Sequence, residues 1–85
     1  MFLHPKAAKA LEKLDANTKA RIKEAWKELV DNPEKVGKQL KLSDFWSLRI
    51  RDYRAIYEID RDKNQVVVTF IGHRKNVYDD FTKML

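Results

Sequence analysis

The stretch FWSLRIRDYRAIYEID, residues 45–60, alternates apolar and polar side chains with a period of two on both sides of Arg51 and Asp52. This alternation predicts two β-strands joined by a turn, because successive side chains of a strand point to opposite faces. Arg51 and Asp52 are not favoured in a two-residue turn, so a slightly longer loop is the alternative. With Arg51 and Asp52 in the turn, one apolar face would hold three cross-strand pairs: Ile50 with Tyr53, Leu48 with Ala55 and Trp46 with Tyr57. The opposite face would carry Ser47, Arg49, Arg54, Ile56 and Glu58.

A third strand is expected after the polar turn DRDKN, residues 60–64. The segment QVVVTFI, residues 65–71, is rich in β-branched residues, which favour strands. Pairing Ile59 with Val66 would place Val66, Val68 and Phe70 on the apolar face, and Val67, Thr69 and Ile71 on the arginine face. The period changes after Gly72, and a short C-terminal helix or tail is predicted from Val77, Phe81 and Met84 or Leu85.

Two amphipathic helices are predicted before the strands. Pro5 suits the first turn of a short helix, because the N–H that proline lacks would have no partner there. Residues 19–31 place apolar side chains on one complete helical face. Asn17 or Thr18 is the expected N-cap of this second helix. Because the link between the two helices is short, we expect an antiparallel αα-hairpin.

The element order α-α-β-β-β-α is typical of an α+β fold. We expect an N-terminal αα-hairpin packed on one face of a twisted antiparallel sheet of three to four strands, followed by a short C-terminal helix or tail. Residues 1–85 are expected to form a single domain. The other sheet face mixes arginines with apolar side chains, so we expect the terminal segment, a partner peptide or nucleic acid to cover it.

Composition limits the classes of function. The chain has no cysteine, which excludes a disulfide framework, a thiolate nucleophile and a zinc–thiolate site. It shows no membrane-spanning run and no secretory signal, so a cytoplasmic location is expected. The formal net charge of +5 favours a polyanionic partner. Arginine, which offers phosphate a planar fork, is concentrated in the second half and points to a recognition surface there.

The first candidate site is the pair Arg49 and Arg54, which would lie opposite each other on one face of the hairpin. Like charges placed so destabilise a sheet unless an anion lies between them, although Glu58 or Asp52 would also neutralise one of them. The sequence contains no metal-binding motif, no glycine loop for phosphate and no suitably paired carboxylates. Any chemistry must therefore use Arg, His and Tyr, and no metal or cofactor is expected.

The second candidate site is the segment GHRKNVY, residues 72–78, where the third strand ends. His73 is a candidate acid or base because imidazole titrates near neutral pH, or else a hydrogen-bonded structural residue. Arg74 and Tyr78 are four positions apart, so a helical turn would place them side by side. Tyr78 would stack on a base, orient a hydroxyl or simply pack against apolar neighbours.

The combined order of these motifs resembles the RelE/ParE superfamily of toxins from bacterial and archaeal toxin–antitoxin pairs. The resemblance covers nearly the whole chain, from HPKAAKALEKLD (residues 4–15) through an aromatic-x-φ-R-φ-R strand and DYRAIYEID to GHRKNVY. It implies a RelE-type toxin, a ribosome-dependent endoribonuclease that cuts mRNA in the ribosomal A site without a metal. It also implies a cognate antitoxin as inhibitor, with a heterotetramer as one possible assembly, and the ribosome and mRNA as targets.

By this resemblance, the expected catalytic residues are Arg49, Arg54, His73, Arg74 and Tyr78. Arg49 matches a basic strand position of the family, and His73 stands where some members hold another basic residue. Arg54 and Arg74 would stabilise the phosphate while the ribose 2′-OH attacks it, and Tyr78 would stack on or orient the substrate. Arg51 and Lys75 are expected to bind RNA. The chain departs from the family in two ways: Ser47 stands where some active members carry a lysine, and only MFL precedes His4, so the first strand is short or missing.

Two alternatives stay open. A ParE-like toxin of the same superfamily would inhibit DNA gyrase and cut no RNA, although the GHRKNVY segment disfavours it. A non-catalytic basic domain of the same fold would bind RNA or protein without cleaving anything.

Overall fold

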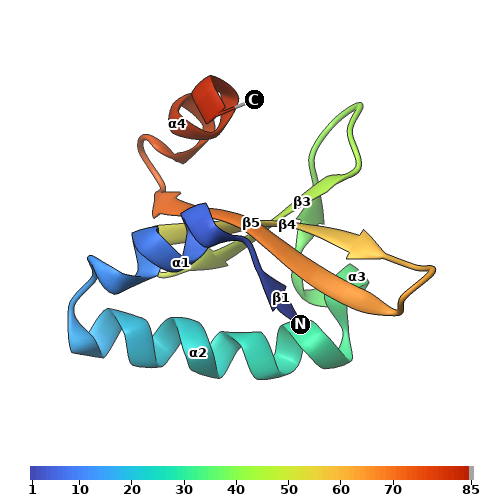
Figure 1. The fold of residues 1–85 in the computed structure, drawn as a ribbon, viewed down its shortest axis with the longest axis horizontal. Coiled ribbons are helices and arrows are strands. Elements are labelled where there is room, and N and C mark those ends of the chain that lie inside the picture. Colours follow the sequence, from blue (N-terminus) through green and yellow to red (C-terminus); the bar gives the residue numbers. More distant parts are fainter. Residues whose placement is uncertain (85) are drawn as a thin grey trace.

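The structure is a computed structural model that describes residues 1–84. Its elements follow the chain in this order: β1 (Phe2–Leu3), α1 (Pro5–Glu12), α2 (Ala16–Asp31), α3 (Pro33–Val36), β2 (Lys38–Gln39), β3 (Phe45–Ile50), β4 (Tyr53–Asp60), β5 (Gln65–His73) and α4 (Val77–Met84). In Figure 1, α1 and α2 cover one face of the sheet and α4 lies on the other. The terminal helix is thus confirmed; Leu85 and the side chain of Met84, also named for it, lie outside the described residues.

The central hairpin has the predicted register. Ile50 pairs with Tyr53, Leu48 with Ala55, and Trp46 with Tyr57. Arg51 and Asp52 form the two-residue turn, and Arg51 adopts a positive φ of 55°. The period-two pattern therefore predicts both strands and their pairing correctly.

The sheet is larger and more mixed than expected. Residues 1–84 form five strands in the order β1-β5-β4-β3-β2, rather than an antiparallel sheet of three to four strands. β1 runs parallel to β5, with Phe2 opposite Val67. β2 runs antiparallel to β3, with Lys38 opposite Ser47. Each of these edge strands has only two residues. A segment of two residues is too short to show an alternation of apolar and polar side chains.

The prediction of which sheet face each residue of β5 occupies is wrong for the residues after Val68. Ile59 pairs with Val66 as predicted, but the register shifts between Ile56 and Tyr57, whose partners are Phe70 and Val68. Thr69 is therefore the extra residue of a β-bulge, and its Oγ1 donates a hydrogen bond to Ile56 O at 3.0 Å. As a result, Ile71 faces the helices α1 and α2, whereas Phe70 faces α4.

The N-terminal helices also differ from a simple αα-hairpin. α1 packs against β5, and α2 packs against β3 and β5, so the sheet supplies the main tertiary contacts of both helices. Asp15, rather than Asn17 or Thr18, is the N-cap of α2, because its side chain accepts a hydrogen bond from Thr18 N. None of the helices within residues 1–84 has the length and apolar character needed to cross a membrane.

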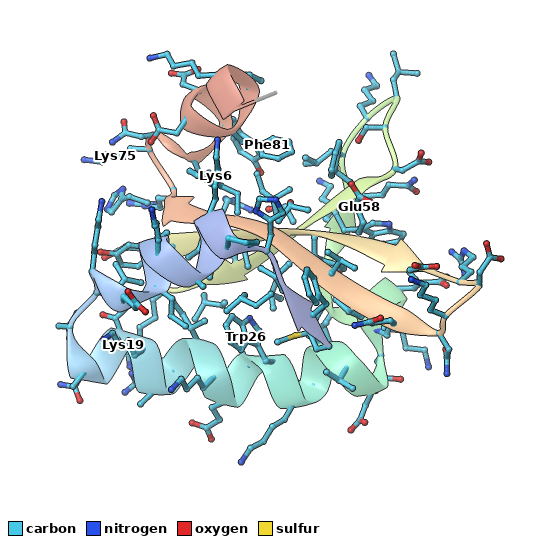
Figure 2. All side chains as sticks on the ribbon, viewed as in Figure 1. Lys6, Lys19, Trp26, Glu58, Lys75 and Phe81 are labelled. Carbon is cyan, nitrogen blue, oxygen red and sulfur yellow. The ribbon has the colours of Figure 1, made fainter. Side chains whose placement is uncertain are left out.

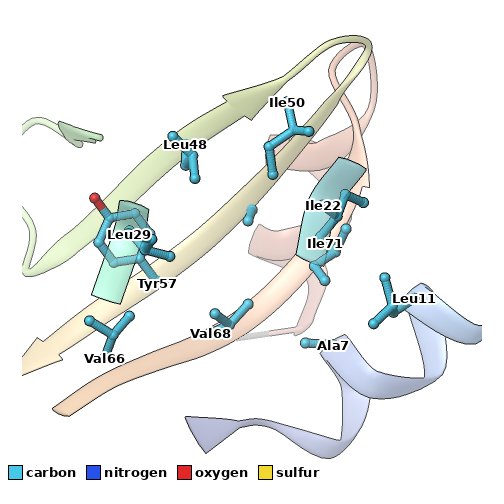
Figure 3. Packing of buried hydrophobic residues seen from close by; sticks show 11 residues of the cluster. Ala7, Leu11, Ile22, Leu29, Leu48, Ile50, Tyr57, Val66, Val68 and Ile71 are labelled. Carbon is cyan, nitrogen blue, oxygen red and sulfur yellow. The ribbon is translucent and has the colours of Figure 1, made fainter. Parts of the chain in front are cut away.

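The main core lies between α1, α2 and the sheet (Figure 3). Its buried members come from every layer: Ala7, Leu11, Ile22, Leu29, Leu48, Ile50, Ala55, Tyr57, Val66, Val68 and Ile71. Trp26 points from α2 toward the sheet (Figure 2). This core holds one face of the sheet rigid and leaves the other face to α4.

Candidate functional site

Helix α4 covers the second face of the sheet by means of a small apolar cluster. Ile56, Val77 and Phe81 are buried there, with Phe45 and Phe70 packed against them. The Phe45 and Phe81 rings meet edge to face with centroids 4.9 Å apart, and Figure 2 shows Phe81 directed toward the sheet. The C-terminal segment, rather than a partner peptide or nucleic acid, therefore covers this part of the sheet face.

Gly72 allows this helix to approach. A Cβ at position 72 would lie 3.2 Å from Phe70 Cε2 and 3.2 Å from Val77 Cγ2, closer than ordinary van der Waals contact. Gly72 also pairs directly with Arg54 of β4. The glycine therefore stands where β5, the start of α4 and an arginine come together.

A polar cluster of Arg54, Ser47 and Tyr78 lies beside these apolar contacts. Ser47 is only 3% exposed, and its Oγ lies 3.3 Å from the Tyr78 hydroxyl and 3.5 Å from Arg54 Nη1. The Arg54 guanidinium carbon lies 5.9 Å from the centre of the Tyr78 ring, within the range of a cation–π contact. A strand pair and the first turn of α4 thus place a guanidinium and a phenol side by side.

Arg49 extends the cationic surface along the hairpin. It pairs directly with Arg54, as the alternation predicts, and its Nε donates a hydrogen bond to Arg51 O at 3.2 Å. Among residues 1–84, neither Arg49 nor Arg54 forms an ion pair. Glu58 and Asp52 therefore leave both guanidinium groups available to an external anion.

Arg74 lies against the turn between β3 and β4. Its backbone N–H donates to Asp52 O at 2.7 Å, and its Nε lies 3.7 Å from Asp52 Oδ1. Arg51 of the same turn and Lys75 of the next loop are both exposed. These cations therefore gather at one end of the sheet, the end at which Arg49 and Arg54 pair.

His73 is not part of this cluster. It pairs with Tyr53, and the two rings meet edge to face with centroids 5.5 Å apart. Because Tyr53 alternates with Arg54, His73 lies on the α1 and α2 side of the sheet. Its Nδ1 accepts a hydrogen bond from Lys75 N at 3.2 Å, which fixes the loop that leads to α4.

The site is an open cationic surface. A separate cavity of about 470 Å³, next to Trp46, Glu58 and Arg61, contains none of the candidate residues. The part of the chain that the structure describes has no cluster of three His, Cys, Asp or Glu side chains able to hold a metal ion. Arginine forks on an open surface suit phosphate groups of a polymer. The alternation placed Ser47 on the correct face of the sheet. The sequence did not reveal its contacts with Arg54 and Tyr78.

Comparisons with known proteins agree with this fold. The profile of the family described as the ParE toxin of the type II toxin–antitoxin system, parDE, matches residues 1–78. No curated protein sequence matches the chain. A chain in the RelBE2 toxin–antitoxin complex from Mycobacterium tuberculosis is 32% identical with a TM-score of 0.76, and the match covers 85% of this chain and 93% of that one.

Two further solved structures are similar. The isolated RelE toxin of E. coli is 26% identical with a TM-score of 0.74, over 98% of this chain and 96% of that one. In the RelB–RelE complex from Methanococcus jannaschii, a chain with 21% identity and a TM-score of 0.76 shares the fold over 95% of this chain and 99% of that one. The family profile and these matches together show that the chain belongs to the ParE toxin family of type II toxin–antitoxin systems, within the RelE/ParE superfamily.

Proposed function

We propose that the protein is a RelE-like toxin, a ribosome-dependent endoribonuclease that cleaves mRNA without a metal. The observation that carries this proposal is the contact of Arg54 and Tyr78 through buried Ser47, beside the guanidinium of Arg49, which forms no ion pair within residues 1–84. A rigid sheet carries Arg54, so its donors are oriented before a phosphate arrives. Preorganised donors of this kind stabilise the charge that develops in a phosphoryl transition state.

The chemistry is an internal transfer within the RNA. The ribose 2′-oxygen bonds to the adjacent phosphorus, the bond from phosphorus to the 5′-oxygen breaks, and a proton passes from the 2′-hydroxyl side to the leaving oxygen. The products are a 2′,3′-cyclic phosphate and a 5′-hydroxyl. In our proposal Arg54 and Arg74 bind the non-bridging oxygens, and Tyr78 orients the substrate.

The remaining candidates have supporting roles. Arg49, Arg51 and Lys75 lie at the same end of the sheet, where they would hold neighbouring phosphates. The position of His73 on the other face gives no support to a direct role in proton transfer. Its contacts with Tyr53 and with the Lys75 backbone instead suit a residue that fixes the loop.

The proposed partner is a cognate antitoxin that inhibits the toxin in the cytoplasm, with a heterotetramer as one possible assembly. The support comes from the similar structures, because RelBE2 and the RelB–RelE complex from Methanococcus jannaschii are toxin–antitoxin complexes. Co-expression with the product of the adjacent reading frame, followed by light scattering, would measure the stoichiometry.

The second candidate function is inhibition of DNA gyrase, and one observation favours it: the matching family profile is that of ParE toxins. The structural matches favour the RelE-like alternative. The two functions differ in their target, so a single induction experiment separates them. Cleaved mRNA with arrested translation supports the ribonuclease, whereas a DNA-damage response with intact mRNA supports the gyrase inhibitor.

The decisive experiment uses a purified translation system and a defined mRNA stalled on ribosomes. Primer extension should reveal cleavage in the A site, and the upstream fragment should end in a 2′,3′-cyclic phosphate. Arg54→Ala and Arg74→Ala should each slow cleavage by about 100- to 1000-fold. Arg61→Ala is the matched control. Arg61 is exposed and lies in the turn that follows β4, at the end of the sheet away from Arg54, where it forms an ion pair with Glu34 of α3.

Two results would contradict the ribonuclease proposal or its assigned site. If the wild-type protein leaves mRNA intact but inhibits purified gyrase, the ribonuclease proposal fails. If Arg61→Ala slows cleavage as much as Arg54→Ala, loss of any surface cation would explain the effect, and the assigned site would be wrong.

A further inference from the structure

Lys38 lies next to the polar cluster through the pairing of an edge strand. β2 pairs with β3 so that Lys38 is directly opposite Ser47. Directly opposed side chains in an antiparallel pair share one face, with Cβ atoms about 4.5–5.5 Å apart. Because Ser47 contacts both Arg54 and Tyr78, Lys38 belongs to the same face of the sheet as those two side chains.

The backbone that carries Lys38 is fixed on both sides. A Cβ at Gly37 would overlap the Tyr57 hydroxyl, so only glycine lets the chain pass over that buried ring. Tyr57 Oη donates a hydrogen bond to Pro33 O at 2.6 Å. On the other side of Lys38, Leu40 N donates to a carbonyl of β3, that of Phe45, at 2.8 Å. The lysine therefore has a defined starting point on the sheet.

The charge of Lys38 is not neutralised by an acidic side chain within residues 1–84. Its side chain is exposed, and within residues 1–84 it forms no ion pair. Together with Arg49 and Arg54 it brings a third cation to the surroundings of one small serine. Like charges gathered on a sheet face disfavour folding, and a bound anion relieves the repulsion.

We propose that Lys38 is a further substrate-contacting residue, whose ammonium group binds a non-bridging oxygen of the phosphate held by Arg54. This inference rests on the proposed ribonuclease function. The lysine side chain is exposed and flexible, so from its place opposite Ser47 it acts as a mobile point charge at this face. Lys38 thereby adds, from a neighbouring strand, a cation to the face on which β3 carries Ser47.

The test compares Lys38→Gln, Lys38→Arg and the control Lys41→Gln in single-turnover cleavage of ribosome-bound mRNA. Lys41 is an exposed lysine of the loop between β2 and β3, so its replacement removes the same charge nearby. Losing one hydrogen bond to a charged group should lower kcat/KM about 10- to 100-fold for Lys38→Gln. Lys38→Arg should keep most of the activity, and Lys41→Gln should match the wild type.

Thermal melting accompanies each variant, and equal melting temperatures show that the fold is retained. If wild type cleaves and Lys38→Gln cleaves as fast as Lys41→Gln, the inference is overturned and the proposed function stands. It is also overturned if Lys38→Arg loses as much activity as Lys38→Gln at equal stability. If the wild type cleaves no mRNA, the proposed function itself fails, and the role of Lys38 fails with it.

Discussion

Replacing Gly72 by alanine should test how tightly the candidate site depends on the docking of α4. The added Cβ would lie 3.2 Å from Phe70 Cε2, 3.2 Å from Val77 Cγ2 and 3.3 Å from Val77 Cβ. All three atoms belong to the cluster that holds α4 on the sheet. Both neighbours must therefore move by a few tenths of an ångström, and Val77 carries the adjacent Tyr78 with it.

The expected magnitude follows from two opposing effects. Inserting a methyl group into a packed contact destabilises a protein by about 1–3 kcal/mol. Alanine also reduces the conformational freedom of the unfolded chain, which offsets about 0.4–1 kcal/mol. We therefore expect a net loss of about 1 kcal/mol in the free energy of unfolding, or a melting temperature lower by about 4–8 °C.

The local effect should exceed the global one. At assay temperature the Gly72→Ala protein should remain folded, yet the shift of α4 should separate Tyr78 from Ser47. Under the proposed ribonuclease function, this shift should slow mRNA cleavage by at least about tenfold, the loss expected for one hydrogen bond to a charged group. Hydrogen exchange measures the opening of α4 separately from that of the sheet. Thr82→Ala is the control, because Thr82 is exposed on the same helix. Unchanged exchange and full activity in Gly72→Ala would refute this account of the glycine.

Two other variants test the stability of the fold. Tyr57→Phe should lose about 1 kcal/mol at pH 7, because it removes the hydrogen bond to Pro33 O. Burial raises the pKa of Tyr57 to about 12 from 10.0, so the wild type should lose stability from pH 10 to 12 as the unfolded tyrosine ionises, and urea melts should show its advantage over Tyr57→Phe shrinking there. Asp15→Ala removes the N-cap of α2 and should lower the free energy of unfolding by about 1 kcal/mol, whereas Asn17→Ala should leave the melting curve nearly unchanged.

The candidate site was predicted in part. The alternation correctly placed Arg49 opposite Arg54 and Ser47 on the same face. The position of Tyr78 was expected only from its spacing to Arg74, whereas in the structure it contacts Arg54 and Ser47 instead. That contact depends on how α4 lies on the sheet, and helical spacing describes only neighbours within one helix.

The sheet face that His73 occupies could not be predicted from the sequence. In sequence it adjoins Arg74, but each step along a strand reverses the direction of the side chain. The bulge at Thr69 adds one residue to β5 and so changes which face every later residue occupies. Without the bulge, His73 would share the face of Arg54; with it, His73 packs on Tyr53.

The combined order of motifs along the chain indicated the superfamily by resemblance. Local patterns in the amino-acid sequence determined the two amphipathic helices and the hairpin register around Arg51 and Asp52. Each of these follows from the preferences of residues close together in the chain. Tertiary structure alone decided the bulge, the presence of β2 and the position of Lys38 beside Ser47. It also decided that the first strand is short rather than missing. Those features depend on hydrogen bonds and packing between distant segments, which a two-residue strand or one extra residue does not encode locally.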